Sequence, residues 1–139
     1  MGAPVQRLAR AGLLAVALLG LTACPHQVDL NPTTIWPGAK GRAALSRDGR
    51  SRVVAEVSVA RLAPPNRLSP PFRCYVVWAE PPRKPAINEG LLRIDEKLEG
   101  KLRFTIVAQR FDIFITAENN PRVRAPAGPE ILRTNVNPI

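Results

Sequence analysis

Residues 52–59 read Arg52-Val53-Val54-Ala55-Glu56-Val57-Ser58-Val59, the most regular pattern in the chain. Successive side chains of a β-strand point to opposite faces, so residues at every second position share a face. One face carries Val53, Ala55, Val57 and Val59; the other carries Arg52, Glu56 and Ser58 with Val54. The pattern predicts a strand over residues 52–62 with one side in a hydrophobic core.

The residues before this stretch predict the strand that pairs with it. Asp48-Gly49 separates residues 52–62 from another run of strand-forming residues, 40–47. Glycine adopts positive φ angles without steric cost, and Asp-Gly is therefore a common β-hairpin turn. We expect these two runs to form an antiparallel hairpin.

Five more runs of strand-forming residues follow, each ended by turn residues. They are residues 72–79, 91–95, 101–108, 111–118 and 130–136. Two proline-rich segments, 63–71 and 80–85, must be loops because proline cannot donate a hydrogen bond to a sheet. No stretch keeps a 3.6-residue apolar period, so helix should be minor.

Seven short runs separated by turns indicate an all-β fold. The expected architecture is an immunoglobulin-like antiparallel β-sandwich of about seven strands, with Trp78 in the third run as the largest core side chain. A transthyretin-like Greek-key sandwich is the alternative. We expect strands 91–95 and 130–136 to lie at sheet edges and Cys74 to be a buried, apolar-like thiol.

The N-terminal residues have a different composition. Arg7 and Arg10 precede an apolar run from Ala11 to Leu21, which is too short to span a bilayer. Leu21-Thr22-Ala23-Cys24 follows, and this motif resembles the lipobox of bacterial lipoprotein precursors. The resemblance implies that the Cys24 thiol carries a diacylglycerol and that residues 1–23 are a cleaved signal peptide.

The same resemblance implies a place for the protein. The sorting rule of Gram-negative lipoproteins reads the residue after the acylated cysteine, and Pro25 there indicates the outer membrane, facing the periplasm, rather than the inner membrane. Residues 24–38 are rich in Pro, Asn and Gly and predict a flexible tether, which about 14 extended residues would stretch to roughly 45–50 Å. Residues 39–139 would then form one β-sandwich domain.

The chain is strongly basic, with a formal net charge of +9. Arginine supplies most of this charge, and guanidinium groups bind phosphate and carboxylate in a bidentate manner. The positions singled out for contact with an anionic envelope surface or polymer are Arg47, Arg50, Arg52 and Arg124. The competing interpretation is a solvated basic surface, and nucleic acid is a poor partner for an exported protein.

No set of side chains adds up to a catalytic centre, so we expect no enzyme, no cofactor and no metal. The single histidine, His26, lies in the predicted tether, where nothing would orient it. Asp95, Glu96 and Glu99 are clustered but lack a calcium-loop spacing, and no Cys or His spacing predicts zinc. A solvated charge cluster is the simpler interpretation of these three carboxylates.

One cluster of charged residues is the candidate ligand site. Glu80 and Glu118 each end a predicted strand, and Arg83 and Arg122 follow them in the adjoining loops. If the two strands are neighbours whose ends coincide, the four side chains would meet at a tip of the sandwich. A carboxylate pair there could bind a ligand or, as a remote alternative, hydrolyse glycosides.

The sequence over residues 75–132 resembles the extracytoplasmic domain of anti-sigma-K-type regulators. The shared motifs are Tyr75-Val76-Val77-Trp78, Gly90-Leu91-Leu92, Phe111-Asp112-Ile113-Phe114-Ile115-Thr116-Ala117-Glu118 and Pro126-Ala127-Gly128-Pro129. The resemblance implies a β-sandwich, but the transmembrane helix and cytoplasmic sigma-binding domain of that family have no counterpart here. We therefore expect a lipid-anchored binding or structural module, with a regulatory accessory of an extracytoplasmic stress or sigma/anti-sigma system as the alternative.

Overall fold

The computed structural model describes residue 2 and residues 24–137. Eight strands follow one another along the chain: β1 (His26–Pro32), β2 (Lys40–Asp48), β3 (Arg52–Ala60), β4 (Cys74–Glu80), β5 (Ile87–Leu92), β6 (Gly100–Val107), β7 (Phe111–Glu118) and β8 (Glu130–Val136). A single 3-10 turn, η1 (Pro65–Arg67), precedes β4. The predicted signal peptide, residues 1–23, lies outside the described residues except for Gly2.

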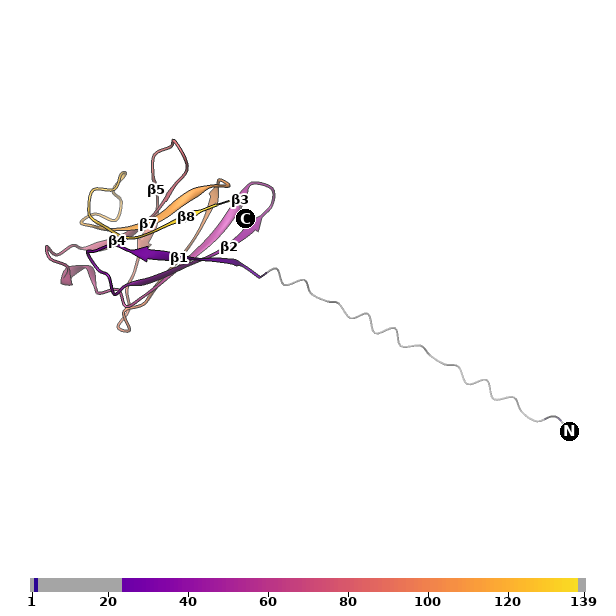
Figure 1. Cartoon of the computed structure of the whole chain (residues 1–139), viewed down its shortest axis with the longest axis horizontal. Coiled ribbons are helices and arrows are strands. Elements are labelled where there is room, and N and C mark those ends of the chain that lie inside the picture. Colours follow the sequence, from indigo (N-terminus) through magenta and orange to yellow (C-terminus); the bar gives the residue numbers. More distant parts are fainter. Residues whose placement is uncertain (1, 3–23, 138–139) are drawn as a thin grey trace.

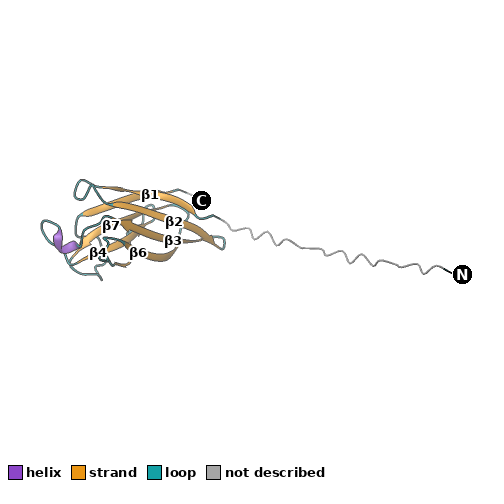
Figure 2. Cartoon of the chain, turned by 90° about the horizontal axis from the view of Figure 1, so that it is seen from below, coloured by secondary structure: helices purple, strands orange, loops and turns teal. Residues whose placement is uncertain are grey.

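All eight strands belong to one hydrogen-bonded sheet in the order β5-β4-β7-β8-β1-β2-β3-β6. Every neighbouring pair is antiparallel. The sheet curls until its two edge strands, β5 and β6, lie beside each other, which gives a nearly closed, barrel-like body (Figures 1 and 2). The predicted all-β, antiparallel fold is confirmed.

Strand β1 joins the two halves of the curled sheet. Its first residues, from His26 to Leu30, pair with β2, whereas Asn31 and Pro32 pair with β8. A strand that changes partners in this way forms a corner between two packed sheets. One half is then β1-β2-β3-β6 and the other is β8-β7-β4-β5.

The strand order differs from that of an immunoglobulin-like sandwich. In the immunoglobulin arrangement the second strand lies between the first and the fifth, whereas here β2 lies between β1 and β3. The predicted hairpin explains this order, because Asp48 pairs with Arg52 and the ladder continues to Lys40 and Ala60. Strand β8 also has two neighbours, so the prediction of an edge position for residues 130–136 is wrong.

The prediction of a flexible tether over residues 24–38 is also wrong for most of its length. Residues 26–32 form β1, in which Leu30 is buried, and Val28 packs on the core. The following loop is fixed by a hydrogen bond from Trp36 Nε1 to the Arg61 carbonyl oxygen, at 3.0 Å. Val28 and Leu30 alternate along β1 and both pack on the core, although Pro, Asn and Gly residues surround them in the sequence.

The main core lies between the two halves of the sheet. The burial of β3 alternates along its length, as residues 52–59 predict, with Val53, Ala55, Val57 and Val59 turned inward. Opposite them lie side chains from β4, β7 and β8, among them Tyr75, Phe111, Ile113 and Leu132. The buried Tyr75 hydroxyl donates a hydrogen bond to the Ala63 carbonyl oxygen at 2.6 Å.

A second, smaller core lies on the outer face of β4 and β7. It contains Cys74, Val76, Trp78 and Phe114, and loop residues Ala86 and Val123 pack on it with Leu91. Strand β4 is therefore buried on both faces, which accounts for its unbroken apolar sequence. Trp78 is fully buried, as predicted, but in this outer cluster and not between the halves.

Replacing Leu30 tests whether β1 belongs to the folded body. We expect Leu30→Ala to lower the free energy of unfolding by about 2–4 kcal/mol, because it empties a buried site, whereas Ile35→Ala, in the exposed loop after β1, should change it by less than about 0.5 kcal/mol. Denaturant unfolding of both variants measures the difference. Equal, small effects would mean that residues 26–32 are a tether after all.

The buried phenol of Tyr75 predicts a pH dependence above neutrality. Burial raises the pKa of Tyr75 to about 12, so the folded protein keeps a proton that the unfolded chain loses above about pH 10. Stability should therefore fall between about pH 10 and 12, by at most about 1.4 kcal/mol per pH unit. Tyr75 is the only tyrosine, so the ultraviolet absorbance of tyrosinate follows its ionisation directly. Tyr75→Phe, which has no ionisable phenol, is the control.

Candidate functional site

The predicted tip cluster is not assembled. Strands β4 and β7 are neighbours, as supposed, but they are antiparallel, and Glu118 pairs with Cys74 while Glu80 pairs with Asp112. The two glutamates thus lie at opposite ends of the ladder, about 20 Å apart at 3.3–3.4 Å per residue. This separation removes the glycoside-hydrolase alternative, which requires the two carboxylates to flank one bond.

Glu118 is a buried structural carboxylate. Its Oε1 accepts hydrogen bonds from the Thr116 hydroxyl at 2.7 Å and from the Ala127 amide at 3.0 Å, and both of its carboxylate oxygens accept from the Gly128 amide at 3.1 Å. The residue is only 3% exposed. A buried charge requires such partners, so Glu118 fixes the loop 119–129 onto β7.

The same network continues into the outer core. Trp78 Nε1 donates to the Thr116 hydroxyl oxygen at 2.8 Å, and Thr116 donates in turn to Glu118. The loop lies so close to β7 that a Cβ atom on Gly128 would stand 1.7 Å from the Ala117 carbonyl oxygen. Trp78, Thr116, Glu118 and Gly128 therefore meet here, where they hold a loop on a sheet.

Arg133 forms the second polar cluster of this outer face. Strand pairing aligns Trp78, Phe114 and Arg133 across β4, β7 and β8. The rings of Trp78 and Phe114 are stacked with centroids 6.1 Å apart, and the Arg133 guanidinium lies 4.2 Å from the Phe114 centroid. This arrangement is a cation–π contact on a partly covered surface.

Three carboxylates surround the Arg133 guanidinium. It contacts Glu130 at 2.9 Å, Asp112 at 2.5 Å and, more distantly, Glu80 at 3.8 Å. The hydrogen bond to Glu130 and the charges of Glu130 and Asp112 raise the pKa of Arg133, although partial burial opposes the shift. Glu80 thus pairs with Arg133, not with the predicted Arg83 partner, and three carboxylates already offset the charge of this guanidinium.

The basic positions singled out from the sequence separate into two regions. Arg47, Arg50 and Arg52 line one shallow depression with Gln109, at the turn between β2 and β3. Arg124, like Arg122, is exposed on loop 119–129, which leaves β7 at the opposite end of that strand. The first three residues are therefore neighbours, and Arg124 is not one of them.

The β2–β3 turn belongs to a larger surface that we call the hairpin end. Its other parts are the β6–β7 turn, residues 108–110, and the β4–β5 loop, residues 81–86. The two are adjacent, because Arg110 lines a depression with Arg83 and Lys84. Arg83, assigned from the sequence to the tip cluster, is therefore part of the hairpin end.

Cys24, the predicted acylation site, also lies at the hairpin end. It is exposed and separated from β1 only by Pro25. His26 pairs with Leu45, near the end of β2 that leads into the β2–β3 turn, and Figure 1 shows the start of β1 on the same side of the body as that hairpin. His26 itself is exposed.

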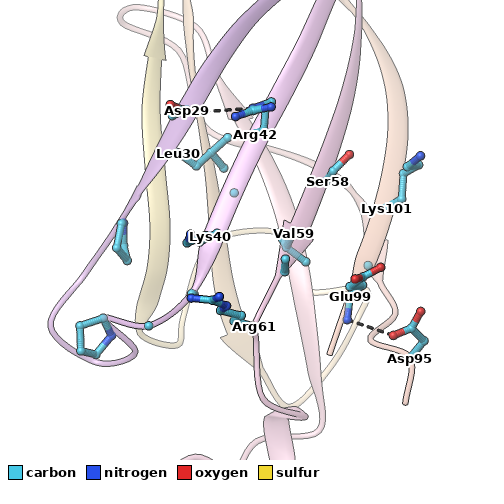
Figure 3. Close-up of a pocket in the computed structure, with 17 residues that line it drawn as sticks. Asp29, Leu30, Lys40, Arg42, Ser58, Val59, Arg61, Asp95, Glu99 and Lys101 are labelled. Atoms are coloured by element: carbon cyan, nitrogen blue, oxygen red, sulfur yellow. Dashed lines mark hydrogen bonds and ion pairs between the residues drawn. The ribbon is translucent and has the colours of Figure 1, made fainter. Parts of the chain in front are cut away.

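An open groove of about 1110 Å³ runs across β1, β2, β3 and β6 (Figure 3). Charges of both signs line it, including Lys40, Arg61 and Glu99. Arg42 pairs with Asp29 at 3.2 Å, and Asp95 Oδ1 accepts backbone hydrogen bonds from Lys97 and Glu99. Asp95 thus shapes its own turn, and the groove has no preference for one sign of charge.

Cys74 is not part of a reactive centre. Cys74 is buried, as predicted, and its thiol donates to the Glu118 carbonyl oxygen at 3.3 Å. Burial and the nearby Glu118 charge raise the pKa of the Cys74 thiol, so it stays protonated at neutral pH. Within the described part of the chain, no three His, Cys, Asp or Glu residues are grouped as a metal site would require.

Some residues of the hairpin end were missed from the sequence, and a simple signal would have found them. In an antiparallel pair, the end of one strand lies beside the start of the next. Glu80 should therefore have been matched with the start of β7, at Phe111 and Asp112, which brings Arg110 close to Arg83. No such local signal predicts the contacts of Arg133, because they depend on the pairing of β8 with β7.

A search for membrane-spanning helices found none among residues 2 and 24–137. No family model, no curated protein and no solved structure matches the chain.

Replacing Glu118 tests its structural role. Glu118→Gln puts an amide N–H₂ group where backbone N–H groups need an acceptor, and we expect it to lower the free energy of unfolding by about 1–3 kcal/mol. Glu96→Gln, on an exposed loop residue, removes the same charge and should have almost no effect. Denaturant unfolding compares the two, and equal stabilities would exclude a structural role for the Glu118 carboxylate.

Proposed function

We propose that this chain is a lipid-anchored lipoprotein of the bacterial cell envelope, whose domain serves as a non-enzymatic binding or structural module. The observation that carries the proposal is the motif Leu21-Thr22-Ala23-Cys24, whose exposed cysteine lies at the start of the folded body. Acylation of Cys24 would leave the domain outside the cytoplasm. Pro25 after the cysteine favours the outer membrane facing the periplasm.

The arrangement of the domain supports a binding or structural role over catalysis. Glu80 and Glu118 are far apart, and Glu118 is engaged by backbone amides. The exposed His26 has no carboxylate to orient it among the described hydrogen bonds and ion pairs. The basic hairpin end is the surface best suited to an anionic envelope component.

The regulatory alternative retains one specific argument, the resemblance over residues 75–132. Three of its motifs supply Trp78, Thr116, Glu118 and the backbone of Gly128, which hold loop 119–129 on the sheet, and these contacts indicate no partner. A sigma-factor gene beside this one would favour the regulatory accessory. Neighbouring envelope-assembly or secretion genes would favour the structural module.

Mass spectrometry of the mature N-terminus tests the anchor. We expect a chain that begins at Cys24 and carries a diacylglycerol, and we expect Cys24→Ser to be left unprocessed and without lipid. Cys74→Ser is the matched control, because it removes the other, buried thiol and should leave processing unchanged. An unmodified Cys24, or cleavage at another residue, would contradict the proposal.

A further inference from the structure

The hairpin end gathers basic side chains from three separate parts of the chain. They are Arg47, Arg50 and Arg52 at the β2–β3 turn, Arg83 and Lys84 in the β4–β5 loop, and Arg110 in the β6–β7 turn, and all of them are exposed. Gln109 lies beside the first group and Arg110 beside the second, so the surface is continuous. Its basic character comes from the fold, because no single segment holds more than three of these residues.

The acidic residues at this end lower its positive charge but do not cancel it, since Asp48, Glu80 and Asp112 are outnumbered by six exposed basic side chains and Arg133. Asp48 pairs with Arg52 at 3.3 Å. Glu80 and Asp112 contact Arg133, which is not one of the exposed basic residues. In the described part of the chain, the side chains of Arg50, Lys84 and Arg110 form no ion pair, so they are available to an external anion.

Exposed apolar side chains accompany the charges. Val107, which pairs with Arg52 across β3 and β6, is 69% exposed, and Ile87 at the start of β5 is 44% exposed. The third large exposed apolar residue, Ile35, lies in the loop between β1 and β2 at the other end of the body. Basic residues with interspersed exposed apolar side chains are typical of surfaces that meet lipid headgroups.

The position of Cys24 indicates which external surface this end would meet. With only Pro25 between Cys24 and β1, an acylated cysteine would hold the hairpin end within a few residues of the bilayer. The opposite end, where Asp95, Glu96 and Glu99 alternate with basic residues, would face away. Anchor and basic surface therefore lie on the same side of the body.

We propose that the hairpin end docks on a bilayer surface containing anionic phospholipid and so fixes the orientation of the domain. This inference rests on the proposed acylation of Cys24 and adds a contact surface to it. Guanidinium groups bind phosphate in a bidentate manner, and lipid attachment combined with a basic surface is a recognised pair of membrane signals. Arg124, on loop 119–129, is not part of this contact.

The experiment uses the acylated full chain, reconstituted in vesicles of phosphatidylcholine with or without phosphatidylglycerol. A fluorophore is attached at Ser51→Cys on the β2–β3 turn or at Asn66→Cys in η1, and a quencher is attached to lipid headgroups. Native cysteines do not interfere, because Cys74 is buried and an acylated Cys24 has no thiol. We expect phosphatidylglycerol to strengthen the quenching at position 51, and we expect no quenching at position 66. High salt should abolish the effect of phosphatidylglycerol at position 51.

Two sets of charge reversals complete the test. The triple variant Arg50→Glu, Arg83→Glu and Arg110→Glu should lower the ratio of docked to undocked domain, measured by quenching at position 51, by at least about 100-fold. Each basic residue near the surface strengthens the docking equilibrium about fivefold. Arg67→Glu with Arg93→Glu and Lys97→Glu makes the same charge change at the other end and should leave quenching unaltered. Circular dichroism confirms that both triple variants fold.

The possible failures are distinguishable. A chain that lacks lipid and does not float with vesicles overturns both the anchor and the docking surface. A chain that is acylated and floats, but shows equal quenching at position 51 with and without phosphatidylglycerol, overturns the docking surface alone. Equal effects of the two triple variants would also overturn it, because the contact would then depend on overall charge.

Discussion

The division of β1 between two partners is the constraint on which the rest of the structure depends. Strand β1 is hydrogen-bonded to both β2 and β8, and without its bonds to β8 the sheet would separate into two four-stranded halves. The curl that follows brings the inner faces together and encloses the main core between them. It also carries the start of β1 to the hairpin end, so the first described residues and the basic turns share one side of the body.

The local pattern of the sequence was sufficient for the class of fold but not for its connectivity. Alternation in residues 52–59 and the Asp48-Gly49 turn specify β3 and its hairpin, because neighbouring residues decide both. Strand β1 escaped prediction because it has only two apolar residues, Val28 and Leu30, among residues typical of linkers. Its stability comes from hydrogen bonds to distant strands, which no local window contains.

The candidate site was predicted less well than the fold, for a related reason. Glu80, Glu118, Arg83 and Arg122 were grouped because each lies near the end of a strand, but antiparallel pairing sends the two glutamates to opposite ends. Cross-strand neighbours then decide their partners: Glu80 meets Arg133, and Glu118 meets the amides of its own loop. Arg47, Arg50 and Arg52 remained together because one short turn carries all three.

The contact between β5 and β6 affects how readily one molecule can pair with another through its sheet edges. The edge of an open sheet exposes hydrogen-bonding groups that can recruit a strand from another molecule, and such recruitment leads to aggregation. In this body the two edge strands lie beside each other instead of facing outward. Because β5 and β6 cover part of each other's edge, a neighbouring copy finds fewer unpaired backbone groups on which to add a strand, and polymerisation through these edges is disfavoured.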